Sequence, residues 1–293
     1  WDVGYGFRPN DMVQQEVRRS LLSTPPEGRP LLQAEHFDGD AATSLVWAQP
    51  QQLNAALADS RGADESALAL HHYRRQGAVD WHGFARLGRH TGTSLGAAVA
   101  WVAGDELALH ASLRWQQRYD AWATTLQQPG DLARQNPWAV ATQGSAAQAL
   151  VGLQWTGAAQ QSLLIEAWHD GTALSAADWR RWGQHNLTLR ASPAPAAARA
   201  GNLAWQASPL GSANLQRNSV FARLAWQPDR WQVSADVLWH PADGGRVVTA
   251  ALQWQGDRWR INAALRHYGG KADAVLAQLP QRRVGLLAAT WSF

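Results

Sequence analysis

Residues Trp231 to His240 read WQVSADVLWH, an alternation of two kinds of side chain. One set of alternate positions holds Trp231, Val233, Ala235, Val237 and Trp239. The other set holds Gln232, Ser234, Asp236, Leu238 and His240. Because successive side chains of a β-strand point to opposite faces, this order predicts a strand with one apolar face and one largely polar face.

The same alternation returns along the chain. It is clearest in 79–87, 93–103, 107–115, 147–155, 220–226, 231–239, 248–254 and 259–265. No apolar-side position of these segments carries a charge, although 17% of the chain is charged. The opposite side accepts charged and histidine residues, namely Asp80, Arg86, His110, Arg114, Arg223, Asp236 and Arg260. Lipid on one side and water on the other impose such a division, since a charge facing the bilayer midplane costs roughly 2 to 4 kcal/mol.

Segment length separates two fold classes. A soluble β-sandwich also alternates, but its strands are usually about 5 to 6 residues long. The present segments approach the roughly 9 to 11 residues that a tilted strand needs to cross a bilayer. No apolar run approaches the roughly 18 to 20 residues of a spanning helix, which excludes a helical membrane protein. The sequence therefore predicts an all-β fold, a transmembrane antiparallel meander β-barrel of about 16 strands that forms a single domain over 1–293.

Connection lengths support a barrel. Short turns are expected at 104–105, 157–160, 228–230 and 256–257, and longer connections at 119–145, 170–185, 209–217 and 269–281. Outer-membrane barrels alternate short and long connections in this way. Two connections depart from the pattern: 89–92 is short where a long one is expected, and 192–201 is long where a short one is expected.

Two segments are predicted to be long loops, 10–30 and 119–145. Long loops without regular structure are usually functional or disordered. For 119–145, a constriction folded into the barrel and an external loop both stay open. Because the chain begins at Trp1 without a methionine, we also expect an N-terminal part to be missing.

The chain has 18 tryptophans, which either a large aromatic core or a membrane-interface belt could require. Seven of them lie beside short turns or at the last strand on the apolar side, namely Trp101, Trp155, Trp226, Trp231, Trp254, Trp259 and Trp291. Indole rings favour the headgroup level of a bilayer, so these seven are predicted to form an interface girdle. Trp115, Trp239 and Trp168 are expected to form the belt at the other strand ends.

The C-terminus places Leu287, Ala289, Trp291 and Phe293 on one face of a final strand that begins near Val284. This segment resembles the closing strand of Gram-negative outer-membrane β-barrel proteins of the porin-like kind, which ends in phenylalanine. The resemblance implies a cell outer membrane location, with outer-membrane lipids around the barrel. It also implies that the barrel-assembly machinery reads this strand, with Phe293 as the assembly signal.

The charged side of the strands is predicted to line a pore. Rings of arginine in a pore favour anions, so Arg86, Arg114, Arg223 and Arg260 predict a channel for small hydrophilic solutes that weakly favours anions. In the alternative, the arginines pair with carboxylates, among them Asp80, Asp236 and Glu166, and only stiffen the wall. Three further arginines are candidates for the same face, namely Arg74, Arg190 and Arg266.

Two other functions stay open. A structural or scaffold barrel would enclose or anchor a partner protein, and the small residues Gly96, Ala98 and Ala100 would let a polypeptide approach the wall. Independently of its function, the assembly of identical chains into a homo-oligomer also stays open. An outer-membrane hydrolase could use His110 and Ser112, but alternate residues of a strand lie roughly 6.5 to 7 Å apart, too far for a direct hydrogen bond, so no enzyme is expected.

No cofactor, metal or nucleic acid is expected. The chain lacks cysteine, which excludes disulfides and thiolate metal sites. It contains no glycine-rich phosphate loop, HExxH helix or EF-hand pattern. Its formal charge of +3 is not concentrated in a basic stripe, as a nucleic-acid-binding protein would show.

Overall fold

The computed structural model describes residues 30–48, 65–125, 136–212, 214–279 and 281–292. The first strands are β1 (Leu31–Asp38), β2 (Ala41–Ala48), β3 (Ala67–Gln76), β4 (Val79–Gly88), β5 (Gly92–Val102), β6 (Leu107–Gln116), β7 (Tyr119–Thr124) and β8 (Trp138–Gln143). The remaining strands are β9 (Ala146–Thr156), β10 (Gln161–Asp170), β11 (Asn218–Trp226), β12 (Trp231–His240), β13 (Gly245–Gln255), β14 (Trp259–Gly269) and β15 (Arg283–Trp291). The helices are α1 (Ala176–Ala191), α2 (Ala196–Trp205) and the 3-10 helices η3 (Ser208–Gly211) and η4 (Val275–Gln278).

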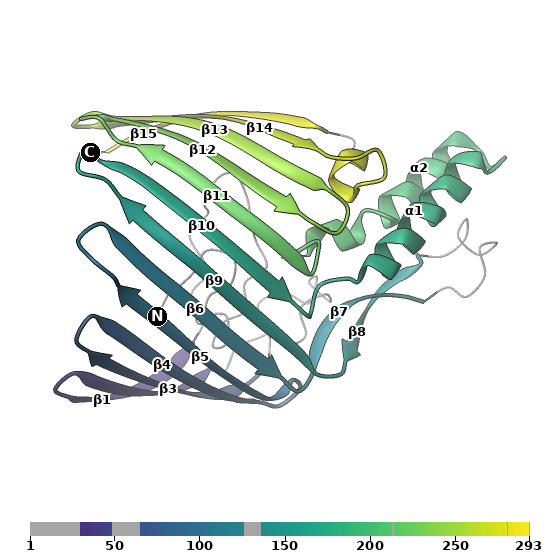
Figure 1. The fold of residues 1–293 in the computed structure, drawn as a ribbon. Helices are drawn as coiled ribbons and strands as arrows, with labels where there is room; N and C mark the ends of the chain where they lie inside the picture. Colours follow the sequence, from purple (N-terminus) through teal and green to yellow (C-terminus); the bar gives the residue numbers. More distant parts are fainter. Residues whose placement is uncertain (1–29, 49–64, 126–135, 213, 280, 293) are drawn as a thin grey trace.

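One antiparallel sheet dominates the molecule (Figure 1). Its 13 strands follow the chain order, except that β6 pairs with β9 because β7 and β8 form a separate two-stranded sheet. Figure 1 shows the tilted strands curving from β1 round to β15. The predicted all-β antiparallel meander is confirmed, and each of the eight alternating segments lies within one strand or extends past its end by a single residue. The described residues form 15 strands, against the predicted 16 or so.

Local sequence explains the tight hairpins. Two-residue turns at 39–40 and 77–78 join β1 to β2 and β3 to β4. Gly39 and Gly77 adopt φ values of 55° and 61°, a region that glycine enters without a Cβ penalty. Between turns, apolar residues lie across from one another on neighbouring strands, as Val237 does from Val248.

The two ends of the sheet differ. At the short end, the connections are 39–40, 77–78, 103–106, 157–160, 227–230 and 256–258. At the long end, they include 89–91, 117–145, 171–217, 241–244 and 270–282. The predicted alternation is confirmed, and the connection at 89–91 is a short one at the long end, as its sequence suggested.

The connection between β10 and β11 corrects the predicted strand order. The described residues between 171 and 217 form α1, α2 and η3 and no strand, so the predicted short-end connection at 192–201 was wrong. Ser175 starts α1: its hydroxyl accepts from the Asp178 backbone N–H, and the Asp178 carboxylate accepts from the Ser175 backbone N–H. Trp179, Trp182 and Leu189 then follow at helical spacing and are buried. None of the described helices has the length and apolar character needed to cross a bilayer.

The segment 119–145 is also more ordered than a loop. Strands β7 and β8 pair over six residues each, from Tyr119 across from Gln143 to Thr124 across from Trp138. Residues 126–135 lie outside the described part of the chain, as do 1–29, so the predicted loop at 10–30 is described only at Pro30.

Candidate functional site

The main sheet has two chemically opposite faces. The face that carries Val237, Leu252 and Leu265, here called the apolar face, is exposed, with Leu265 at 60%. The other face, here called the polar face, carries Arg114 and Glu166, which are only 4% and 1% exposed. This distribution reverses that of a water-soluble protein, in which charges are almost never fully buried and large apolar patches are rarely exposed.

The alternative of a soluble sandwich placed four tryptophans in an interior. Trp226, Trp231 and Trp259 are instead between 43% and 49% exposed, and Trp254 is half-buried. All four lie on the apolar face. The exposed side of the strands therefore does not form a protein core in this chain.

The seven tryptophans predicted to form the girdle lie on the apolar face at the short end. Each is the first, last or last-but-one residue of its strand. The rings of Trp259 and Trp291 meet edge to face at 4.7 Å. The indole N–H groups of Trp155 and Trp226 donate to short-turn groups, a carboxylate oxygen of Glu106 at 3.0 Å and a backbone carbonyl at 3.2 Å. A membrane role for this ring of indoles stays a prediction.

Other tryptophans refine the expected belts. Trp115 and Trp239 are exposed on the apolar face at the long end, as expected. Trp168 is 5% exposed and lies on the polar face, so its predicted place in a belt was wrong. In β10 the exposed large side chain is Ile165, and Trp168, three residues further on, points to the other side, where it packs with Leu150 and Phe221.

The residues predicted to line a pore all lie on the polar face by strand register. They are Asp80, Arg86, His110, Arg114, Arg223, Asp236 and Arg260. Arg223 stands directly across from Asp236. The other residues are spread over several strands and form no single cluster. Their role in a pore stays a prediction.

Arg86 forms a buried ion pair that the sequence did not reveal. Its guanidinium lies 2.8 Å from a carboxylate oxygen of Glu65, and both side chains are 3% exposed. The same carboxylate accepts from the backbone N–H groups of His90 and Thr91 in the turn at 89–91. A side chain at Gly88 would collide with the ends of Glu65 and Arg86 and would displace them from their present positions. Arg86 therefore fits the alternative in which arginines pair with carboxylates and stiffen the barrel wall.

The surroundings of Glu65 determine its ionisation. Burial alone would raise the pKa of this carboxyl group, but the hydrogen bonds from Thr91, the positive charge of Arg86 and the His90 backbone N–H outweigh it. The net result is a pKa below its usual value of 4.5. Glu65 is therefore held in its charged form next to Arg86.

His110 and Glu166 form a second contact on the polar face. His110 Nε2 lies 2.9 Å from a carboxylate oxygen of Glu166. The strand between them places Gly152 in line with both, and a Cβ there would collide with the His110 ring. A glycine in the middle of β9 thus lets two side chains meet across an intervening strand.

The three further candidate arginines do not share one face of the sheet. Arg266 lies on the polar face, where its Nε donates to Thr249 at 3.1 Å. Arg74 lies across from Trp81 on the apolar face, and Arg190 lies in the last turn of α1, so both predicted placements were wrong. For Arg74 the reason is the parity of β3, in which His71 is buried and Arg74 falls on the side of Leu68 and Leu70.

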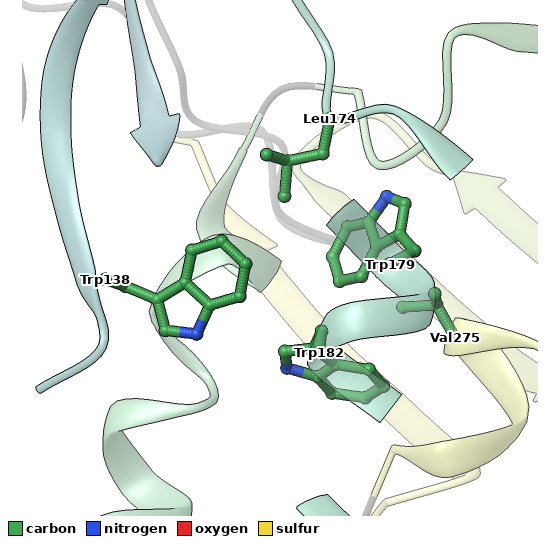
Figure 2. Close-up of a cluster of buried hydrophobic side chains, with 5 residues drawn as sticks. All are labelled: Trp138, Leu174, Trp179, Trp182 and Val275. Atoms are coloured by element: carbon green, nitrogen blue, oxygen red, sulfur yellow. The ribbon is translucent and has the colours of Figure 1, made fainter. Parts of the chain in front are cut away.

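The long end carries a folded cap, defined as the β7–β8 hairpin, α1, α2, η3 and η4. Figure 2 shows its centre, where side chains from three separate connections meet. These residues are Trp138, Leu174, Trp179, Trp182 and Val275, all at most 8% exposed. Gln206 joins two of the indoles, because its side-chain oxygen accepts from Trp138 and its backbone carbonyl from Trp182. The sequence predicted neither this core nor its helices.

Two carboxylates fasten the cap to the strands. Asp170, at the end of β10, accepts from Gln148 on β9 and from Asn214 after η3. Asp243, in the turn between β12 and β13, accepts from Gln216 at 3.0 Å and from the Val275 backbone N–H at 3.1 Å. Both carboxylates at this junction thus have hydrogen-bond partners, as buried polar groups generally do.

The geometry does not favour a hydrolase. His110 is engaged by Glu166, and within the described residues the Ser112 hydroxyl has no hydrogen-bond partner, so no base activates it. Among the same residues, no three histidine or acidic side chains gather as metal ligands would.

In the final strand, Leu287 and Trp291 are exposed on the apolar face, while Phe293 lies outside the described residues.

No protein-family model matches the chain, and no curated protein is similar to it in sequence. Among solved structures, an engineered form of the Rhodopseudomonas blastica porin is 9% identical, with a TM-score of 0.44 over 90% of this chain and 89% of that one. OccAB1 of Acinetobacter baumannii is 10% identical, with a TM-score of 0.48 over 90% of this chain and 67% of that one.

Proposed function

We propose that the chain is a porin-like channel of a Gram-negative outer membrane, which passes small hydrophilic solutes along its polar face. One observation supports this most directly: large apolar side chains are exposed on one face of the strands, while buried charged side chains such as Arg114 and Glu166 lie on the other face. A surrounding hydrocarbon phase would stabilise such a surface, because about 25 cal/mol is lost for each Å² of apolar area left in water. The long-end cap is then the part outside the bilayer.

The charges on the polar face support a weak anion preference. Arg86 is neutralised by Glu65, and Arg223 faces Asp236, so neither adds much to the field along a pore. Arg260 and Arg266 remain on β14, and no ion pair involves either of them within the described chain. Unpaired guanidinium groups beside a solute path attract anions.

A scaffold barrel around a partner protein is less well supported. The strip of Gly96, Ala98 and Ala100 was its best candidate contact. Ala98 is already only 4% exposed, so the chain itself covers the middle of the strip. Glu166, Arg114 and His71 are likewise buried, which leaves little exposed surface on their strands for a second polypeptide to contact.

Planar-bilayer recordings test the channel. The purified protein should give discrete conductance steps, and in a salt gradient its reversal potential should indicate a modest excess of anion flux. Arg260→Glu with Arg266→Glu should reverse that excess. Arg246→Gln is the matched control, because this arginine lies across from Trp239 on the apolar face. The absence of steps, or cation selectivity in the unaltered protein, would contradict the proposal.

A further inference from the structure

The last five strands of the main sheet carry a groove that the proposed solute path does not use. Its volume is about 960 Å³, and its lining consists of residues from β11 to β15. These strands form the upper part of the sheet in Figure 1. The volume lies within the roughly 300 to 1,000 Å³ of sites that bind small molecules.

Strand register places the groove on the apolar face. Two consecutive rows of this face line it completely, one from Leu224 to Gly285 and the other from Trp226 to Leu287. The remaining lining residues form the single row of opposite parity between these two. The next polar-face rows on either side do not contribute to the lining. The groove therefore opens towards the side that the proposed channel presents to lipid.

Small side chains form the floor of the groove. Ala235 and Ala250 lie next to each other between Leu224 and Leu265, which are 56% and 60% exposed. Across from Leu265, a Cβ added to Gly285 would meet no atom within 4 Å. A thin apolar chain fits such a depression, because it contacts the floor and the projecting side chains at once.

Positive charge adjoins the groove on its long-end side. Arg283 lies across from His267, one row from Gly285, and both side chains are exposed. The His267 ring leans over Gly269, which lies across from Arg246, since a Cβ added to Gly269 would be 3.2 Å from Nε2 of the ring. No acidic residue lies on this face of β11–β15. Among the residues that the structure describes, neither arginine takes part in an ion pair.

The depth of these residues relates them to lipid headgroups. Arg246 lies across from Trp239, an exposed indole at the long end. In the proposed membrane placement a belt of indoles marks the headgroup level, so Arg283, one row nearer the middle, lies just beneath it. A guanidinium at that depth is costly unless an anion accompanies it.

We propose that this surface binds a lipid with a phosphate in its headgroup, from the leaflet at the long end. Arg283 and His267 donate to the phosphate oxygens, and one acyl chain lies in the groove over Ala250 and Gly285. Phosphate and chain are both needed, because the cations adjoin an apolar depression and no other polar group. The inference rests on the membrane placement proposed above, since only there does the apolar face meet lipid.

The first test compares two lipids with the same acyl chains by native mass spectrometry in detergent. The unaltered protein should retain dilauroyl phosphatidic acid about tenfold more tightly than dilauroylglycerol, which lacks the phosphate. Arg283→Gln with His267→Gln should abolish this preference. Arg282→Gln is the matched control, because Arg282 continues the strand on the side of Tyr268, the polar face. Equal retention of the two lipids by the unaltered protein would overturn the proposal.

The second test concerns the groove. Gly285→Trp places an indole on the floor next to Arg283 and should weaken the retention of phosphatidic acid about tenfold. Gly83→Trp is the matched control, since Gly83 lies on the apolar face of β4 and its Cβ would also meet nothing within 4 Å. Equal effects of the two tryptophan variants would overturn the role of the groove.

Inorganic phosphate separates a lipid site from a site for a free anion. It should displace phosphatidic acid only at a far higher concentration, because it lacks the chain that the groove buries. Displacement at equal concentration would show an anion site without a lipid. A bound polypeptide in the mass spectrum in place of the lipid would show that a protein covers the groove, which also contradicts the proposal.

Bilayer recordings on the same preparations distinguish this inference from the proposed channel. A protein that conducts but does not prefer phosphatidic acid retains the channel and loses the lipid site. A protein that prefers phosphatidic acid but passes no current retains the lipid site and loses the channel.

Discussion

The short end of the sheet and the cap at its long end use tryptophan in opposite ways. At the short end, Trp231 and Trp259 are exposed on the apolar face. At the long end, Trp138, Trp179 and Trp182 are at most 5% exposed inside the cap. A high tryptophan content therefore does not choose between an interface belt and an aromatic core, because this chain contains an exposed ring of indoles and a buried cluster.

The largest effect should come from removing a cap indole. Trp182→Ala leaves a cavity at the centre of the cap and removes a hydrogen bond to Gln206, and we expect a loss of about 5 kcal/mol in cap stability. Rapid proteolysis within 171–217, with the sheet intact, would show it. Trp231→Ala at the short end is the control, and equal cleavage of the two variants would refute the contrast between the ends.

The next effect concerns ion pairs. Arg86→Met leaves Glu65 buried without its counter-ion and should cost about 3 kcal/mol in unfolding free energy. Asp257→Asn breaks the pair with Arg230 at the short end, where the side chains are 88% and 53% exposed, and should cost at most about 1 kcal/mol. Chemical unfolding in detergent measures both. A larger loss for the short-end variant would contradict the buried pair.

Acid should loosen the long end selectively. Because the folded-state pKa of Glu65 lies below 4.5, its contribution to stability is complete above about pH 4.5 and is lost as the pH falls through the lower, folded-state value. The protection of the amides in the turn 89–91, measured against their intrinsic exchange rates at the same pH, should therefore fall below that pH. Glu65→Gln should be weakly protected at every pH, and an unchanged acid response in this variant would assign the effect to another group.

The smallest effect is spectroscopic. In vesicles with brominated acyl chains, Trp231→Phe should remove a small part of the fluorescence quenching, because its indole is exposed on the apolar face. Trp179→Phe should remove unquenched emission instead. If the two substitutions changed quenching alike, the assignment of one end to lipid would fail.

Much of the sheet follows from the sequence. The alternation in β4, β5, β6, β9 and β11 to β14 gives both the strands and their faces, because one misplaced residue would turn a charge such as Asp236 towards the apolar side. The seven residues predicted for the pore share one face for the same reason. The period-2 alternation is thus sufficient to predict strands and their faces where the two sides of a strand have different surroundings.

The cap and the ion pair could not be predicted in this way. Trp179 and Trp182 are spaced for a helix, but the expected alternation of short and long connections favoured further strands in 171–217. The Ser175 and Asp178 capping pair was the signal missed. Glu65 meets Arg86 across a separation of 21 positions in the chain, and no local pattern marks such a pair. Trp168 and Arg74 show that the face on which alternate residues lie must be determined separately for each strand.

The core of the cap also has a bearing on the order of events during assembly. Trp138 precedes β9, whereas Val275 follows β14, so the chain between them contributes six strands to the main sheet before the two side chains can meet. A packed core built from such distant parts of the chain forms late, because long loops must close first. Packing of the cap therefore indicates that the sheet is nearly complete. The time at which the cap indoles become protected from solvent during refolding would measure when this stage is reached.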